Sequence, residues 1–284
     1  MAGVLKIVCT PIGNLGDISL RAIETLKSST MILAENISHS RKLLTALHVD
    51  LRNIKLLSCA QHEEENRIQL VIERLEKGDI ISLISDAGAP VISDPGGRLV
   101  EAVVAAGHQI EVIPGPSAII AALMGAGLIT TRFAFLGFLA KKGKERERLI
   151  KNARAASLAL VIYESPHRVE KTLADLFKWC GPKRVVVARE LTKQFETFHR
   201  GILGQPLLPD FVEKGEAVIV VEGGDVAAEN SPIEIIEEEI AALMQQKCAT
   251  PKEIAKHIAQ KTDMSSKQAY ALVLQIKNAL SRRP

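Results

Sequence analysis

The chain has 284 residues, of which 47% are hydrophobic and 24% are charged, and its net charge at pH 7 is +3. This composition is typical of a globular enzyme with room for two compact domains, and it excludes fibrous and disordered classes. A charge of this size does not by itself indicate a nucleic-acid partner. The four cysteines form no CxxC pair and have no zinc-like spacing, so we expect reduced thiols and no metal site.

The N-terminus leads directly into a predicted strand and shows no signal-peptide pattern. No apolar run reaches the ~18 residues that a membrane span needs. We therefore expect a cytoplasmic protein without a membrane partner.

The first part of the chain alternates strands with helices. An apolar stripe at Ile68, Val71, Ile72 and Leu75 predicts a helix, and a second helix starts near Gly96 and ends at Gly107. Strands are predicted at residues 4–9, 30–35, 79–85 and 109–113. This alternation indicates an α/β domain over residues 1–115.

A second α/β domain is predicted over residues 116–226. It begins with a helix at 117–127, and its strands are expected at 133–138, 158–164, 184–190 and 216–222. The remaining residues, 227–284, read as a helical module with an acidic first helix at Glu234–Glu239. Capping boxes at Thr250–Glu253 and Ser265–Gln268 each begin a further helix, which is typical of a helix-turn-helix-like tail.

Three turns rich in small residues come directly after predicted strands, at Thr10–Asp17, Ser85–Pro90 and Pro114–Ala118. Such turns let the backbone approach a ligand closely, and open α/β sheets bind ligands at the carboxyl ends of their strands. We therefore expect the three turns to converge on one small-molecule site. The chain has no GxGxxG sequence, which argues against a standard dinucleotide fold.

Six segments together carry a family resemblance: Thr10–Asp17, Ser85–Gly88, Ile92–Gly96, Pro114–Ala118, Tyr163–Arg168 and Arg189–Lys193. In this order they resemble the tetrapyrrole methylase superfamily, in the branch that methylates cytidine 2′-hydroxyls of small-subunit ribosomal RNA. The likeness covers about residues 4–223. It implies two α/β domains with the methyl-donor site in the cleft between them, S-adenosylmethionine as cofactor, and a homodimer. It also implies 16S rRNA or the 30S subunit as partner, methylated in the decoding region.

The chain departs from the family pattern at several positions. The family's Glu-Asp-Thr-Arg is Glu35-Asn36-Ile37-Ser38 here, which removes an acid and a base. A family Tyr-His pair is replaced by Cys59-Ala60, although His62 remains. These changes lie mostly around the loops that the resemblance assigns to the substrate, and less around those that it assigns to the methyl donor.

The resemblance implies a set of donor-binding residues. Glycine and serine turns suit a ligand with an adenine, a ribose and an amino-acid end. The alternative is that the glycines and prolines only shape tight turns and that Asp86 is a helix cap. The implied donor residues are Pro11, Gly13, Asp86, Gly88, Ser117, Ala118, Tyr163 and Ala217.

Methyl transfer to a ribose hydroxyl is an in-line displacement in which the nucleophile loses a proton, so positioning and a general base both help. The candidates after predicted strands are Glu190, Lys193, Glu164 and Glu35. A structural ion pair with Arg189 is the alternative for Glu190 and Lys193, and a buried hydrogen-bonded acid is the alternative for Glu35. The sequence does not select one base.

RNA binding requires localised positive charge. The tail from Lys247 to Pro284 holds eight Lys or Arg against two acids. Phosphate contacts of such residues set affinity for RNA, whereas a solvated helical face is the alternative. The candidate RNA-binding residues are Lys141, Lys142, Lys144, Arg146, His167, Arg168 and Arg189.

Two other functions stay open at this stage. A tetrapyrrole-type small-molecule methyltransferase would share the fold and the donor but would not need the basic tail. A ribosome-binding protein with weakened catalysis is suggested by Asn36, Ile37 and Ser38.

Overall fold

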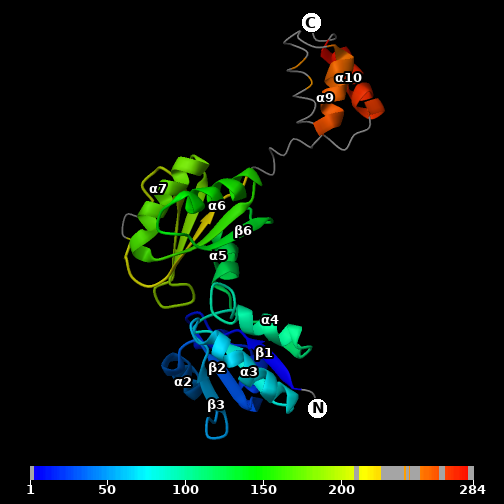
Figure 1. The fold of residues 1–284 in the computed structure, drawn as a ribbon. Helices are drawn as coiled ribbons and strands as arrows, with labels where there is room; N and C mark the ends of the chain where they lie inside the picture. The colour runs from blue at the N-terminus through cyan, green and yellow to red at the C-terminus, as the bar shows by residue number, and fades with distance from the viewer. Residues whose placement is uncertain are drawn as a thin grey trace. The chain divides into compact units, whose positions relative to one another are not determined.

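A computed structural model describes residues 3–207, 211–224, 240, 243, 250–261 and 266–280. The chain divides into two compact units, Met1–Gly223 and Gly224–Pro284, and Figure 1 labels their helices and strands. Among the described residues, no helix is both long enough and apolar enough to cross a membrane.

The larger unit begins with a parallel five-stranded sheet. Its strands follow the order β3-β2-β4-β1-β5, and every neighbouring pair is parallel. The strands are β1 (Val4–Val8), β2 (Met31–Ala34), β3 (Lys55–Ser58), β4 (Ile80–Ile84) and β5 (Gln109–Ile113).

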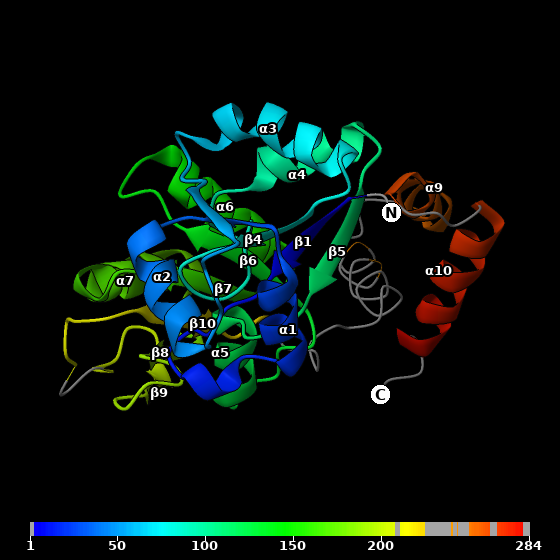
Figure 2. The same cartoon turned by 90° about the horizontal axis from the view of Figure 1, so that it is seen from below.

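Helices cover both faces of this sheet (Figure 2). Helices α1 (Leu20–Ser28) and α2 (Ile37–Ala46) bury Leu26 and Leu44 against one face. Helices α3 (Glu64–Glu76) and α4 (Gly97–Ala105) bury apolar residues against the other face. Both layers follow from the helical spacing of their apolar residues.

A second five-stranded sheet completes the larger unit. Its order is β6-β7-β10-β8-β9, with β6 and β7 parallel and the other pairs antiparallel. Helices α6 (Lys144–Ala155) and α7 (Val169–Cys180) cover one face, and α5 (Ala118–Ala126) covers the other. The strands are β6 (Phe133–Phe138), β7 (Ala159–Glu164), β8 (Arg184–Arg189), β9 (Thr197–Ile202) and β10 (Ala217–Val221).

The predicted α/β class with two sheets is confirmed. The chain passes from the first sheet to the second between Ile113 and Ala118. Strands β3 and β9 were not predicted, and each lies at the edge of its sheet. The predicted boundary at residue 226 and the predicted acidic helix at Glu234–Glu239 lie outside the described residues.

The smaller unit contains α9 (Pro251–Lys261) and α10 (Ser266–Leu280), which pack through Ile254, Ile258 and Val273. The capping box predicted at Thr250 is present. The Thr250 backbone N–H donates to Glu253 Oε2 at 2.7 Å, and the Glu253 N–H donates to Thr250 Oγ1 at 3.4 Å. The second predicted box begins at residue 265, which lies outside the described residues.

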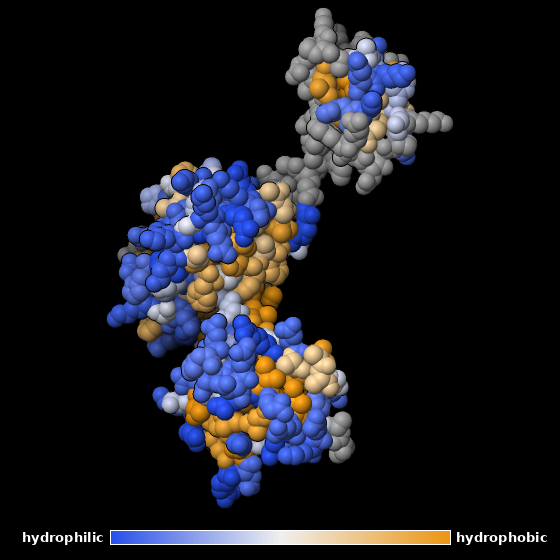
Figure 3. All heavy atoms as spheres, in the orientation of Figure 1, coloured by the Kyte–Doolittle hydropathy of each residue, from blue (hydrophilic) through white to orange (hydrophobic). Residues whose placement is uncertain are grey.

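Hydrophilic residues cover much of α6 and α7 in Figure 3, yet Arg146 of α6 is buried with only 3% of its surface exposed. Its Nε donates to Asp175 Oδ2 at 3.0 Å, and its Nη1 donates to the Ala140 carbonyl at 3.1 Å. Its Nη2 donates to Thr172 Oγ1 at 2.8 Å. The guanidinium therefore ties α6 to α7.

Replacing Arg146 tests this structural role. Arg146→Ala should lower the free energy of unfolding by about 3 kcal/mol, because it removes charge-assisted hydrogen bonds and leaves Asp175 without its partner. The measurement is urea unfolding followed by circular dichroism. Arg148→Ala, an exposed arginine on the same helix, is the control and should change it by less than about 0.5 kcal/mol. Equal effects of the two substitutions would contradict the assignment.

Candidate active site

A cavity of about 690 Å³ lies in the larger unit, lined by residues from both sheets. From the first sheet come the loops after β1, β4 and β5. From the second come β6, β7, β10 and the loop after β8. Its size falls within the range of ~300–1,000 Å³ that is usual for small-molecule sites.

The three small-residue turns meet at this cavity, as the sequence predicted. Thr10 and Gly88 exchange backbone hydrogen bonds of 2.8 and 3.1 Å, and the Thr10 hydroxyl donates to the Ser85 carbonyl at 3.2 Å. Gly115 of the third turn lies against Cys9, where a Cβ would come within 2.9 Å of Cys9 Cβ. Small residues are therefore needed for the turns to approach one another.

Two loops at the cavity hold non-glycine residues in the left-handed backbone region. Val91 and Ser93 have φ of 75° and 65°, and Glu190 and Thr192 have φ of 51° and 63°. Such values are unfavourable for side chains with a Cβ, above all for a branched one, and they cluster at functional sites. The residues between or beside them line the cavity: Ile92, Asp94 and Leu191.

Carboxylates gather on the first-sheet side of the cavity, at Glu35, Asp86 and Asp94. Glu35 Oε2 accepts from the Asp86 backbone N–H at 3.3 Å. Asp86 Oδ1 is buried and has no hydrogen-bond partner among the described residues. Burial, with the charges of Glu35 and Asp86, raises the pKa of Asp94 to about 6 despite a hydrogen bond from Ser85.

An aromatic wall faces these carboxylates. The rings of Phe135 and Tyr163 lie 4.9 Å apart, and those of Phe138 and Tyr163 lie 5.5 Å apart. Burial, with the charges of Asp94 and Glu216, raises the pKa of Tyr163 to about 12, so its hydroxyl stays protonated. Phe138 is 61% exposed, so it lies at the mouth of the cavity.

An ion-pair cluster stands beside the cavity. Lys193 Nζ lies 2.9 Å from Glu190 Oε1 and 2.9 Å from Glu216 Oε2. Burial alone would raise the pKa of Glu190, but hydrogen bonds from Lys193 and from the Glu216 backbone lower it. Burial alone would lower the pKa of Lys193, but its two carboxylate partners raise this pKa above its ordinary value. The cluster fixes the loop that presents Leu191.

Six of the eight predicted donor residues line the cavity, and two do not. Pro11 and Gly13 lie outside it, and Ile12 between them lines it instead. A Cβ on Gly13 would collide with Lys193 Cγ, so this glycine lets the first turn pack on the ion-pair cluster. The six that line the cavity are Asp86, Gly88, Ser117, Ala118, Tyr163 and Ala217.

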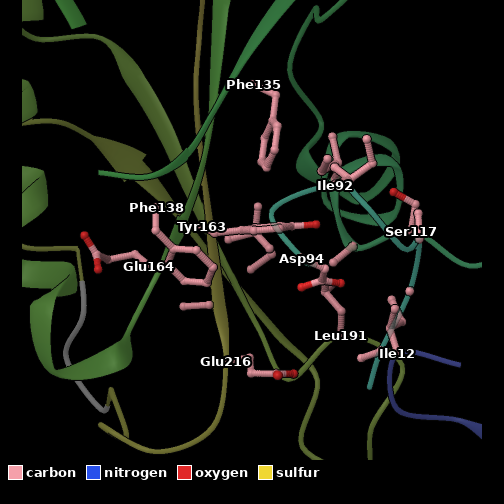
Figure 4. A pocket seen from close by; sticks show the side chains of 18 of the residues that line it. Ile12, Ile92, Asp94, Ser117, Phe135, Phe138, Tyr163, Glu164, Leu191 and Glu216 are labelled. Atoms are coloured by element: carbon pink, nitrogen blue, oxygen red, sulfur yellow. The ribbon is translucent and has the colours of Figure 1, made fainter. Parts of the chain in front are cut away.

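The predicted catalytic residues separate into two groups. Glu35 and Glu164 are among the lining residues, but the Glu164 side chain points away from Asp94 (Figure 4). Its oxygens accept from Thr172 Oγ1 at 2.7 Å and the Ser165 N–H at 2.9 Å. Glu190 and Lys193 belong to the ion-pair cluster and do not line the cavity.

The predicted RNA-binding residues lie in different surroundings. Lys141, Lys142 and Lys144 are exposed. Arg146 is a correction, because its buried guanidinium is engaged by Asp175, Ala140 and Thr172 and does not face solvent.

The other three lie around β7 and β8. His167 is exposed and pairs with Glu213 at 2.9 Å. Arg168 pairs with Glu164 at 3.2 Å, and its Nη2 donates to the Leu139 carbonyl at 2.7 Å. Arg189 is 9% exposed, and its Nη1 donates to the Lys214 carbonyl at 3.3 Å.

Sequence reasoning missed several lining residues. Ile92 and Asp94 belong to a segment that carries the family likeness but for which the sequence suggested no role. Glu216 and the aromatic residues of β6 carry no motif. No group of three His, Cys, Asp or Glu side chains suited to a metal occurs in the part of the chain that the structure describes.

Asn36, where the family has an acid, caps α2. Its Oδ1 accepts from the backbone N–H groups of Ser38 at 3.0 Å and His39 at 3.2 Å. Asparagine caps a helix as well as aspartate does, so the local structure survives this departure. Cys59 is buried in the core of the first sheet.

Comparisons with known proteins agree on one family. The model of Tetrapyrrole (Corrin/Porphyrin) Methylases matches residues 4–207. "Ribosomal RNA small subunit methyltransferase I" of Synechocystis sp. is 40% identical over 281 residues, covering 96% of this chain and 98% of that protein. The protein of the same name from Xylella fastidiosa is 42% identical over 274 residues, covering 94% and 98%. That from Escherichia coli O157:H7 is 40% identical over 239 residues, covering 82% of each chain.

Solved structures show the same fold. The methyltransferase CobJ superposes with a TM-score of 0.61 at 20% identity, covering 78% of this chain and 95% of that one. Diphthine synthase superposes with a TM-score of 0.62 at 15% identity, covering 77% and 90%. The chain thus belongs to the tetrapyrrole methylase family, as a methyltransferase of the branch named ribosomal RNA small subunit methyltransferase I.

Proposed function

We propose that this methyltransferase uses S-adenosylmethionine to methylate the 2′-hydroxyl of a cytidine ribose in the decoding region of 16S rRNA. The observation that carries the proposal is the cavity of about 690 Å³, which brings six implied donor residues together with a cluster of carboxylates. The names of the relatives, which are 38–42% identical, support ribosomal RNA as the substrate.

The residues of the cavity fit such a donor. Asp86 Oδ1 is a buried acceptor without a partner among the described residues, so it can accept from a ligand hydroxyl or ammonium group. Ser117 precedes α5 and makes no capping hydrogen bond, so its hydroxyl is available to a ligand carboxylate. Apolar residues such as Ile12 and Val218 suit an adenine ring. When bound, the donor would supply an electrophilic methyl group on a positively charged sulfur.

The exposed side chains near the mouth of the cavity suit a nucleic acid. Phe138 lies at the mouth, and an exposed aromatic ring can stack on an unpaired base. Lys141, Lys142 and Lys144 follow it closely along the chain and are exposed, so they can reach phosphates.

Two further expectations form part of this proposal. A ribosomal RNA substrate would place the reaction in the cytoplasm. The homodimer implied by the resemblance is supported by apolar side chains of α5, where Met124 is 81% exposed and Ile120 is 47% exposed. Both residues line a groove of about 480 Å³ that a second copy of the chain could cover.

The decisive experiment is methyl transfer from labelled S-adenosylmethionine to undermethylated 30S subunits, to free 16S rRNA and to a tetrapyrrole precursor. We expect label in RNA, recovered after nuclease digestion as 2′-O-methylcytidine by mass spectrometry. Label on a base would contradict the 2′-O assignment. Label only in the tetrapyrrole would establish the small-molecule alternative, and donor binding without transfer would favour a ribosome-binding protein.

Donor binding should depend on the start of α5. Ser117→Trp places a large ring in the cavity and should reduce S-adenosylmethionine affinity at least about 100-fold in calorimetry, because it fills space that the ligand needs. The exposed Glu101 of α4 does not line the cavity, so Glu101→Gln is the control. Unchanged affinity in a Ser117→Trp protein with wild-type circular dichroism would refute the donor site.

The exposed lysines at 141, 142 and 144 should contribute to RNA affinity through phosphate contacts. Replacing Lys141, Lys142 and Lys144 together by Gln should weaken binding to 16S rRNA. It should also make the plot of log K against log salt concentration less steep, by roughly 0.7 for each phosphate that the variant no longer neutralises. S-adenosylmethionine affinity should not change. The measurement is filter binding between 50 and 300 mM salt, and an unaltered slope would assign these lysines to a solvated surface.

A further inference from the structure

We propose that Asp94 accepts the proton of the hydroxyl that is methylated, and that the left-handed backbone at Val91 and Ser93 holds its carboxylate in the cavity for this purpose. This inference rests on the proposed function and identifies the base that the sequence did not select.

The carboxylates that line the cavity are not equally free to take a proton. Both oxygens of Glu164 accept hydrogen bonds, and Arg168 also pairs with it. Glu216 is held by Lys193, and Glu35 accepts from the Asp86 backbone. Oδ1 of Asp86, which has no partner among the described residues, is the acceptor that the proposed function assigns to the donor.

Asp94 is engaged only lightly by comparison, through a hydrogen bond with the Ser85 side chain. Figure 4 shows its carboxylate among the lining side chains, and its charge lies close enough to Tyr163 to raise the pKa of that residue. A general base must lie within hydrogen-bond reach of the proton that it removes, and Asp94 is placed where a ligand in the cavity would meet it.

The charges around Asp94 suit this role. Burial and the neighbouring Glu35 and Asp86 disfavour its ionised form, Ser85 opposes them, and the Tyr163 hydroxyl and Glu216 lie on the second-sheet side. Its pKa of about 6 makes Asp94 ionised at neutral pH yet more basic than an ordinary aspartate. A base with a pKa near the working pH transfers protons most effectively.

The backbone around Asp94 is held at both ends. A Cβ on Gly96, whose φ is 118°, would come within 2.7 Å of Leu83 Cδ2, so the segment after Asp94 lies tightly against β4. A Cβ on Gly137 of β6 would come within 3.3 Å of Ser93 Oγ, so the segment before it meets the second sheet. A left-handed valine persists only where its surroundings enforce it, so the packing around this segment fixes the placement of Asp94.

The step balances with these groups. The proton of the ribose hydroxyl passes to an Asp94 carboxylate oxygen as the hydroxyl oxygen forms its bond to the methyl carbon. The carbon–sulfur bond breaks, and its electron pair stays on sulfur, which becomes neutral. Asp94 then returns its proton to solvent.

The direct test is Asp94→Asn, which keeps the shape of the side chain. We expect turnover at saturating donor and RNA to fall about 10²- to 10⁴-fold. Affinity for S-adenosylhomocysteine, which lacks the sulfonium charge, should stay within about threefold of wild type, so the pocket itself is checked. Glu101→Gln is again the control. Wild-type turnover in a folded Asp94→Asn protein would overturn the inference.

The pH profile separates a base from a merely structural residue. The acidic limb of wild-type turnover should have an inflection near pH 6. Ser85→Ala removes a hydrogen bond that lowers the pKa of Asp94, so it should move this limb to higher pH. Glu35→Gln removes a like charge and should move it to lower pH. A limb that stays in place in both variants would contradict the assignment.

Thermal unfolding of the ligand-free protein gives a readout that needs no activity. Because the pKa of Asp94 is raised on folding, the stability due to its neutral form is present near pH 4 and is lost as the pH rises through about 6. Asp94→Asn avoids this loss. Its Tm relative to wild type should therefore be higher at pH 7.5 than at pH 4.5 by at least about 2 °C.

The proposed function and the role of Asp94 can be overturned separately. If the wild-type protein transfers no methyl group to any RNA, the proposed function fails, and the role of Asp94 fails with it. If the wild-type protein methylates RNA and Asp94→Asn does so equally well, only the role of Asp94 is overturned.

Discussion

Parallel pairing of β1 with both β4 and β5 is the constraint on which the site depends. Val4 stands in register with Ile80 on one side and Gln109 on the other, so the three strands run together and end at one edge. The turns that follow these three strands must then occupy the same small volume. The mutual hydrogen bonds of Thr10 and Gly88 are possible only because those turns carry small residues. The start of α5, and with it one wall of the cavity, follows directly from the third turn.

The cavity is assembled at the expense of local stability. The charges of Glu35 and Asp86 disfavour the ionised form of Asp94 in a partly buried space, and burial of a charge without a full set of partners is unfavourable. Left-handed backbone at Val91 adds strain of order 1–3 kcal/mol. The apolar clusters on both faces of each sheet offset these costs. A folded protein that departs from local preferences at one place commonly does so for function.

The sequence predicted the helices and strands whose local residue pattern is strong. Inner strands such as β8 and β10 are continuous β-branched runs, whereas the missed β3 and β9 are edge strands with exposed and polar positions that weaken the pattern. Arg146 was wrongly predicted to bind RNA, although it shares a helix face with the buried Ile150. The setting of Asp94 was beyond prediction because Glu35 follows a different strand and Tyr163 belongs to the second sheet, so both meet Asp94 only in the folded protein.

The distribution of charge fits the proposed function. Under that proposal, carboxylates inside the cavity would attract a cationic donor and repel phosphates, since Coulomb interactions strengthen where water is excluded. Exposed lysines at 141, 142 and 144 lie in solvent beyond Phe138, where phosphates can be held. Under the proposed function, only a neutral nucleoside would then enter, and only after leaving its stack. Under the proposed function, this arrangement would admit a ribose hydroxyl to the cavity while the phosphates of the RNA stay outside.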